Sequence, residues 1–192
     1  IVMLEPRRLA ARSAARYMAA QLGEEVGKTV GYRTRLDTRV SAATRIEVVT
    51  EGILSRMLQG DEELTGYGIV IFDEFHERSL QADLGLALVR ECQQVLREDL
   101  RVLVMSATLE AAPIARLLGD APVLRCPGQM HPVAIRYSAP GRTPWLDHLA
   151  TVIRQTLAAE PGSVLVFLPG EREIRRLAEQ LEDGLPEDVR LA

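Results

Sequence analysis

The chain has 192 residues, of which 47% are hydrophobic, and its formal net charge at pH 7 is −4. A chain of this length can bury roughly 70% of its unfolded surface, enough for one domain or for one domain and part of another. No apolar run approaches the roughly 20 residues needed to cross a bilayer, and no signal peptide opens the chain, so we expect no membrane segment. The acidic balance argues against a uniformly basic surface for nucleic acid.

The cysteines and the basic residues give further information about the class of protein. Cys92 and Cys126 show no metal-ligand spacing, so we expect reduced thiols in a cytoplasmic protein. Only one of the 23 basic residues is lysine, Lys28, and the others are arginine, which can bind phosphate bidentately. A GC-rich bacterial genome also favours arginine and alanine. Each arginine therefore has to be argued from its position.

The first predicted elements are a buried strand at residues 1–4 and a helix from Pro6 to about Leu22. Proline suits the first helical position, where its missing N–H costs nothing. Arg7 and Arg8 lie at the turn between the two elements, where free backbone N–H groups and the helix dipole favour a phosphate. The chain opens in a strand without methionine and ends in what looks like the entry to another strand. We therefore expect a segment of a longer protein.

The triplet Gly-Lys-Thr at residues 27–29 looks like the end of a P-loop, G-x-x-x-x-G-K-[ST]. The spacing fails, because the residue five places before Gly27 is Leu22. A P-loop also follows a strand and opens a helix, whereas this triplet follows a helix and leads into a strand-like segment at residues 30–33. The sequence predicts an ordinary loop here.

The next predicted strand, at residues 45–49, ends at Thr50, Glu51 and Gly52 and is followed by a helix. Thr50 can cap that helix with its hydroxyl. The N-terminus of a helix also binds anions. A phosphate contact by Thr50 and the adjacent backbone is therefore compatible with capping, and both interpretations stay open.

The most informative stretch is an apolar run at residues 69–72 that stops at Asp73 and Glu74, with His76 two places later. Its length and β-branched content are typical of a strand buried on both faces of a parallel sheet, and such sheets bind ligands at the carboxyl ends of their strands. Neighbouring strand residues point apart. One carboxylate can then hold Mg²⁺ through its water shell while the other orients and deprotonates an attacking water. The alternative is the acidic first turn of a helix.

A predicted helix at residues 80–96 leads to a buried strand at 101–105, which ends in Ser106, Ala107 and Thr108. These hydroxyls can bridge to the carboxylates of the preceding strand end or cap the following helix. A helix to Leu118 and a strand at residues 123–125 close the first domain. A linker rich in proline and glycine follows at residues 127–132. Beyond it we expect a strand at 133–137, a helix at 145–159, a strand at 163–168 and a helix that begins within 169–174.

Several of these stretches, in their order, resemble motifs of the DEAH-box helicases of superfamily 2. Residues 6–11 are similar to motif Ia and residues 50–52 to motif Ib. Residues 72–78 are similar to motif II, residues 106–108 to motif III and residues 169–174 to motif IV. Phe75 stands where that branch usually has alanine, and the variant Asp-Glu-Phe-His-Glu-Arg resembles the bacterial HrpB-type ATP-dependent helicases. Pro169 stands where relatives often have threonine, so this residue supplies neither a hydroxyl nor a backbone N–H to a phosphate.

The resemblance implies an α/β fold of the P-loop NTPase type, with a RecA-like parallel sheet flanked by helices. Residues 1–127 would form most of the first RecA-like domain, with the P-loop strand upstream, and 128–192 the start of a second. The implied activity is hydrolysis of ATP with Mg²⁺, coupled to movement on, or unwinding of, single-stranded RNA. A DNA helicase or translocase of the same superfamily is an alternative, as is a nucleic-acid-binding module with an inactive ATP site.

The resemblance also implies a role for each matching residue. The catalytic residues would be Asp73, Glu74 and His76, with Asp73 and Glu74 at the metal through water. The residues that couple ATP hydrolysis to movement on the nucleic acid would be Ser106, Ala107 and Thr108. The nucleic acid would contact Arg7, Arg8, Thr50, Glu51, Gly52 and Gly170.

Overall fold

In a computed structural model, the chain divides into two compact units, residues 1–126 (unit 1) and 127–192 (unit 2). The structure describes every residue except 108–110, 127, 129–130, 183, 187 and 192. No helix in these described stretches combines the length and the apolar character needed to cross a membrane.

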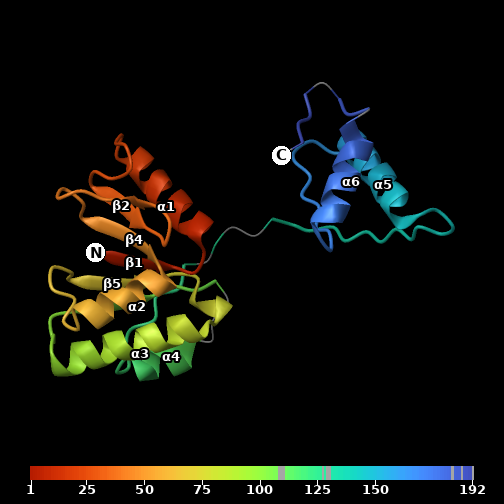
Figure 1. Ribbon diagram of the computed structural model, residues 1–192. Helices are drawn as coiled ribbons and strands as arrows, with labels where there is room; N and C mark the ends of the chain where they lie inside the picture. The colour runs from red at the N-terminus through yellow and green to blue at the C-terminus, as the bar shows by residue number, and fades with distance from the viewer. Residues whose placement is uncertain (108–110, 127, 129–130, 183, 187, 192) are drawn as a thin grey trace. The chain divides into compact units, whose positions relative to one another are not determined.

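Unit 1 is built on a six-stranded sheet with the strand order β3-β2-β4-β1-β5-β6 (Figure 1). Its strands are β1 (Val2–Glu5), β2 (Val30–Arg33), β3 (Thr38–Arg39), β4 (Ile46–Thr50), β5 (Ile69–Phe72) and β6 (Arg101–Val104). Every neighbouring pair is parallel except β2 and β3. This mostly parallel sheet with flanking helices confirms the α/β fold class, which the apolar run at residues 69–72 indicated and the resemblance implied.

The strand register places the carboxyl ends of the parallel strands along one edge of the sheet. Glu5 of β1 lies opposite Thr50 of β4, and Leu4 lies opposite Phe72 of β5. Phe72 in turn lies opposite Val104 of β6. We call this row of strand ends the carboxyl edge. It brings together residues that are far apart in the sequence.

The helices of unit 1 are α1 (Arg8–Gln21), α2 (Glu51–Gly60), α3 (Leu80–Val95) and α4 (Ala111–Leu117), with a short 3₁₀ helix, η1 (Phe75–Glu77). Helix α1 packs small residues such as Ala11 and Ala15 against one face of the sheet, and α2 and α3 cover the other (Figure 1). Side chains alternate along a strand, so in β4 Val48 belongs to the first core and Val49 to the second. The predicted loop at residues 27–29 lies in the turn between α1 and β2.

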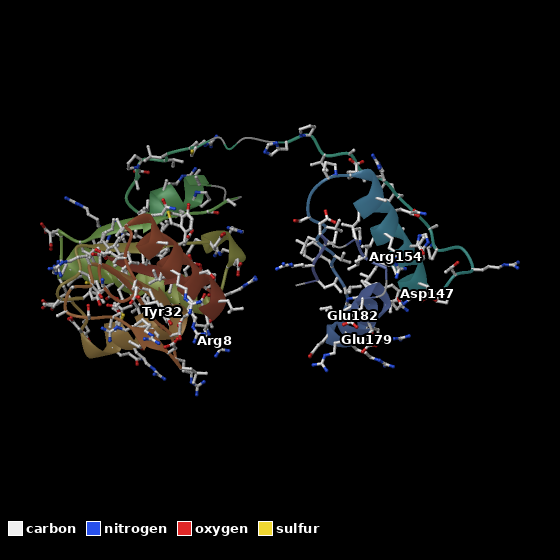
Figure 2. The ribbon with its side chains drawn as sticks, turned by 90° about the horizontal axis from the view of Figure 1, so that it is seen from above. Arg8, Tyr32, Asp147, Arg154, Glu179 and Glu182 are labelled. Carbon is white, nitrogen blue, oxygen red and sulfur yellow. The ribbon has the colours of Figure 1, made fainter. Side chains whose placement is uncertain are left out.

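Unit 2 contains α5 (Trp145–Ala159) and α6 (Glu171–Glu182), both close to their predicted positions. The two helices pack through a small apolar core: Leu146, Ala150, Ile153, Leu177 and Leu181. Figure 2 shows Arg154 on α5 near the α6 residues Glu179 and Glu182, and its guanidinium donates a hydrogen bond to the carbonyl of Gln180 at 2.5 Å. Trp145, the first residue of α5, is about half exposed.

Three predicted strands are wrong, because residues 123–125, 133–137 and 163–168 are not in strands. Their apolar side chains are largely exposed, and Tyr137 is 95% exposed. A strand needs a neighbour for its backbone hydrogen bonds, and none pairs with these segments among the described residues. The predicted burial of β6 is also wrong. It is the last strand in the sheet order and is only partly covered.

Candidate functional site

Carboxyl groups gather on the carboxyl edge at the ends of β1 and β5. Glu5 is buried, with 5% of its surface exposed, and Asp73 is half-buried. Burial, and then the charge and a hydrogen bond of Asp73, raise the pKa of Glu5 to about 7, with smaller effects from the charges of Glu74 and Glu77. Asp73 is fixed in place, because its N–H donates to the carbonyl of Leu4 at 3.0 Å and its carboxylate accepts the N–H of Glu74 at 2.8 Å.

The chain turns sharply after Asp73. Glu74 and Arg78 both adopt left-handed backbone conformations, with φ of 49° and 50°, and η1 lies between them. Phe75 anchors this turn, since its ring is buried edge-on against Phe72 and its N–H donates to the carbonyl of Met105 at 3.1 Å. Left-handed conformations are strained for residues other than glycine, and such strain is common at functional sites. We call residues 74–79 the motif II turn.

His76 lies between a predicted catalytic carboxylate and a predicted coupling residue. Its Nδ1 is 3.3 Å from Oε2 of Glu74 and 3.4 Å from the backbone nitrogen of Ala107. One ring nitrogen either donates to the carboxylate or accepts from the N–H, so it can serve only one of them at a time. Ser106 is exposed beside Ala107, and Thr108 lies outside the described residues.

Arg7 and Arg8 stand where α1 begins, but their surroundings differ. The guanidinium of Arg7 is 3.0 Å from the carboxylate of Glu77 in the motif II turn. Arg8 is exposed at the first residue of α1 (Figure 2), and it has no ion pair or side-chain hydrogen bond within the described part of the chain. Arg8 is therefore available to an anion, whereas Arg7 already has a partner.

Thr50, Glu51 and Gly52 follow the end of β4. Thr50 is the residue before α2, and its side chain makes no capping hydrogen bond, so the capping interpretation is wrong. The carboxylate of Glu51 accepts a hydrogen bond from the hydroxyl of Ser79. Gly52 is exposed, and no atom lies within 4 Å of the place a Cβ would take. This leaves the start of α2 open to a ligand.

Gly170 lies in unit 2, whereas the other predicted site residues lie in unit 1. It precedes α6, whose first turn carries Glu171 and Glu173. A Cβ at this glycine would stand 3.2 Å from Oε2 of Glu173. Two carboxylates in the first turn oppose the binding of a phosphate there.

The chain is similar to known helicases in sequence and in structure. The ATP-dependent RNA helicase HrpB of Escherichia coli (strain K12) is 51% identical over 192 residues, which are all of this chain and 24% of that protein. The crystal structure of the Escherichia coli DEAH/RHA helicase HrpB has a TM-score of 0.87 at 50% identity, over 97% of this chain and 24% of that one. The chain is homologous to the HrpB-type DEAH/RHA helicases.

A more distant relative is the HrpA homolog of Haemophilus influenzae, named as an ATP-dependent RNA helicase. It is 37% identical over 181 residues, which are 93% of this chain and 14% of that protein. No protein-family model matches the chain. The chain described here spans 24% of the length of its Escherichia coli relative.

The donor set of this site fits magnesium better than a transition metal. Among the described residues, no group of three or more His, Cys, Asp or Glu side chains is arranged to hold a metal ion. Magnesium keeps most of its water shell and needs only one or two carboxylates besides the phosphates of a substrate. Asp73 and Glu74 supply such oxygens, and their negative charges add to the effect of burial in raising the pKa of Glu5.

Three residues in contact with the predicted site were not predicted: Glu5, Glu77 and Ser79. Glu5 had a usable signal, because it ends an apolar strand as Asp73 does. Glu77 lies in the stretch similar to motif II and Ser79 follows it, but no sequence signal indicated what either residue would contact. Their partners, Arg7 and Glu51, are distant in the sequence.

Proposed function

We propose that the chain is part of an ATP-dependent RNA helicase and carries its water-activating carboxylate and a portion of its nucleic-acid-binding surface. The observation that carries the proposal is the position of Asp73 and Glu74 at the carboxyl end of a parallel strand, with His76 between Glu74 and Ala107. Unit 1 would be most of a first RecA-like domain, and unit 2 the start of a second. The names of the HrpB and HrpA relatives support this proposal.

In the proposed mechanism, Asp73 would hold Mg²⁺ through water, and Glu74 would take a proton from the water that attacks the γ-phosphate. When bound, the metal neutralises charge on the phosphates. Glu74 suits the role of general base because its side chain is exposed and it lies two residues after the end of β5. His76 links this base to Ala107.

The nucleic acid would lie where α1 and α2 begin. Arg7, Arg8, Thr50 and the backbone around Gly52 would contact phosphates and read no bases, because arginine forks and free N–H groups recognise phosphate geometry. Single-stranded RNA is the proposed ligand. We place the protein in the cytoplasm, a setting supported by its two free cysteines.

The test uses a full-length protein that carries this chain, with Glu74→Gln, which keeps size and hydrogen bonding but removes the base. Nucleotide affinity should persist, while single-turnover hydrolysis falls by about 10²-fold or more. Asp73→Asn should weaken magnesium-dependent nucleotide binding as well.

The matched control is Glu160→Gln, which neutralises an exposed carboxylate that is paired with Arg136. Each protein is assayed with single-stranded RNA and with DNA of the same sequence. Hydrolysis by Glu74→Gln at the unsubstituted rate would refute the mechanism. Equal stimulation by the DNA would favour the DNA translocase.

A further inference from the structure

The Arg7–Glu77 ion pair joins the proposed nucleic-acid surface to the motif II turn. The atoms Nη2 and Oε1 are 3.0 Å apart, and the two side chains are 73% and 34% exposed. Ion pairs this exposed are weak. A nucleic-acid phosphate can offer arginine two charge-assisted hydrogen bonds in place of this single contact. A bound nucleic acid can therefore replace Glu77 as the partner of Arg7.

The motif II turn is fixed near both of its ends. At one end, Phe75 is buried and bonded to the carbonyl of Met105. At the other end, the Ser79 hydroxyl donates to the carboxylate of Glu51 and accepts the N–H of Ala82 at 2.9 Å. If Glu77 moves, the backbone between Phe75 and Ser79 must therefore change its conformation.

His76 is the neighbour of Glu77 inside that fixed interval. Its Nδ1 is within reach of Glu74 on one side and of Ala107 on the other, and it can bond to only one of them. Two alternative bonds for one atom make a two-state element, the kind of physical link that coupling between sites requires. While His76 is bonded to Glu74, the proposed base is restrained.

We propose that Glu77 is a positioning residue that competes with nucleic-acid phosphate for Arg7, so that a bound strand releases the motif II turn and frees Glu74 from His76. This inference rests on the proposed function. It adds a direct route, through Arg7 and Glu77, by which nucleic acid stimulates hydrolysis. In the absence of nucleic acid, the ion pair holds the turn in its less active arrangement.

The test compares Glu77→Gln with the control Glu160→Gln in a full-length protein that carries this chain. Both changes remove one negative charge and one exposed ion pair to arginine. Glu77→Gln should raise the RNA-free rate of Mg-ATP hydrolysis by about fivefold, at the lower end of usual coupling factors, and lower the stimulation ratio by the same factor. Its affinity for single-stranded RNA should rise by about two- to fivefold, because a weak competitor of the phosphate is lost. Glu160→Gln should change neither quantity.

A double substitution separates this route from a general effect of charge. In an Arg7→Ala background, Glu77→Gln should no longer tighten RNA binding, because Arg7 is absent and there is nothing to release. Additive effects of the two substitutions would overturn the proposal. A parallel fall of all rates with the melting temperature would also overturn it, since that is the result of a merely structural role.

Different results would contradict the proposed function and the role of Glu77. If the unsubstituted protein neither binds RNA nor is stimulated by it, the proposed function and this inference are both wrong. If the unsubstituted protein is stimulated and Glu77→Gln behaves like Glu160→Gln, only the role of Glu77 is wrong.

Discussion

Glu5 is a carboxyl group buried on the carboxyl edge between Thr50 and the end of β5. Its pKa is raised from 4.5 to about 7, first by burial and then by Asp73. A raised pKa means that the folded chain holds this proton more tightly than the unfolded chain. The stability contributed by Glu5 is therefore complete below about pH 4.5 and is lost as the pH rises through about 7.

Replacing Glu5 with glutamine should remove this pH dependence. At pH 8, Glu5→Gln should melt about 5 °C higher than the unsubstituted chain, because no buried charge has to form. At pH 4.5 the two proteins should melt together. Thermal denaturation at both pH values provides the measurement, with Glu160→Gln as the exposed control. A melting temperature of Glu5→Gln that is no higher at pH 8 would contradict the assignment.

At the scale of helices and strands, the sequence predicts those elements that a local pattern defines, but it does not predict which strands pair. The strands at β1, β4 and β5 and the helices α5 and α6 follow from apolar runs and helical spacing alone. The segments at 133–137 and 163–168 have strand-like composition but no partner strand, and composition cannot supply one. The catalytic candidates were predictable because a strand end defines them.

The contacts that link the site to its surroundings were not predictable. The Arg7–Glu77 pair and the Glu51–Ser79 bond depend on where side chains of separate elements meet. Arg7 and Glu51 were singled out by their positions at the starts of helices, but nothing in the local pattern indicated that Glu77 and Ser79 would be their partners. Their partners became apparent only once the register of β1, β4 and β5 was known.

The pairing of β2 with β3 depends on a glycine. A Cβ on Gly31 would stand 2.4 Å from the backbone oxygen of Arg39 and 2.9 Å from Cγ1 of Val40. Gly31→Ala must therefore displace β3, and we expect it to lower the free energy of unfolding by about 1–3 kcal/mol.

Gly85→Ala in α3 is the matched control for that change. Its Cβ would meet Leu54 and Phe72 at ordinary contact distances of 3.5 and 3.6 Å. Alanine favours a helix interior by up to about 1 kcal/mol, so this variant should be as stable as the unsubstituted chain or more so. Urea unfolding of both variants checks the prediction. Equal stability of Gly31→Ala and the parent would show that β3 can move at no cost.

At the scale of the whole molecule, the chain holds one part of the proposed ATP site. It contains no G-x-x-x-x-G-K-[ST] stretch, and residues 27–29 lie in a turn that leads into a strand. It also spans only 24% of its Escherichia coli relative. The phosphate cradle and the arginine that stabilises charge on the γ-phosphate are thus to be sought outside these 192 residues.

Residues 1–192 alone should therefore not turn over ATP. Phosphate release with Mg-ATP, measured with and without single-stranded RNA, should equal that of a Glu74→Gln control. Saturable release above that control would show that these residues form a complete site. It would also require a new role for Lys28.

The position of Trp145 at the start of α5 makes the two units optically distinct. It is the single tryptophan of the chain, and it belongs to unit 2. Of the four tyrosines, only Tyr137 lies in unit 2, whereas Tyr32 and Tyr67 are hydrogen-bonded to carboxylates inside unit 1. Fluorescence excited at the red edge of tryptophan absorption will therefore follow unit 2 alone, while tyrosine absorbance will mostly follow unit 1.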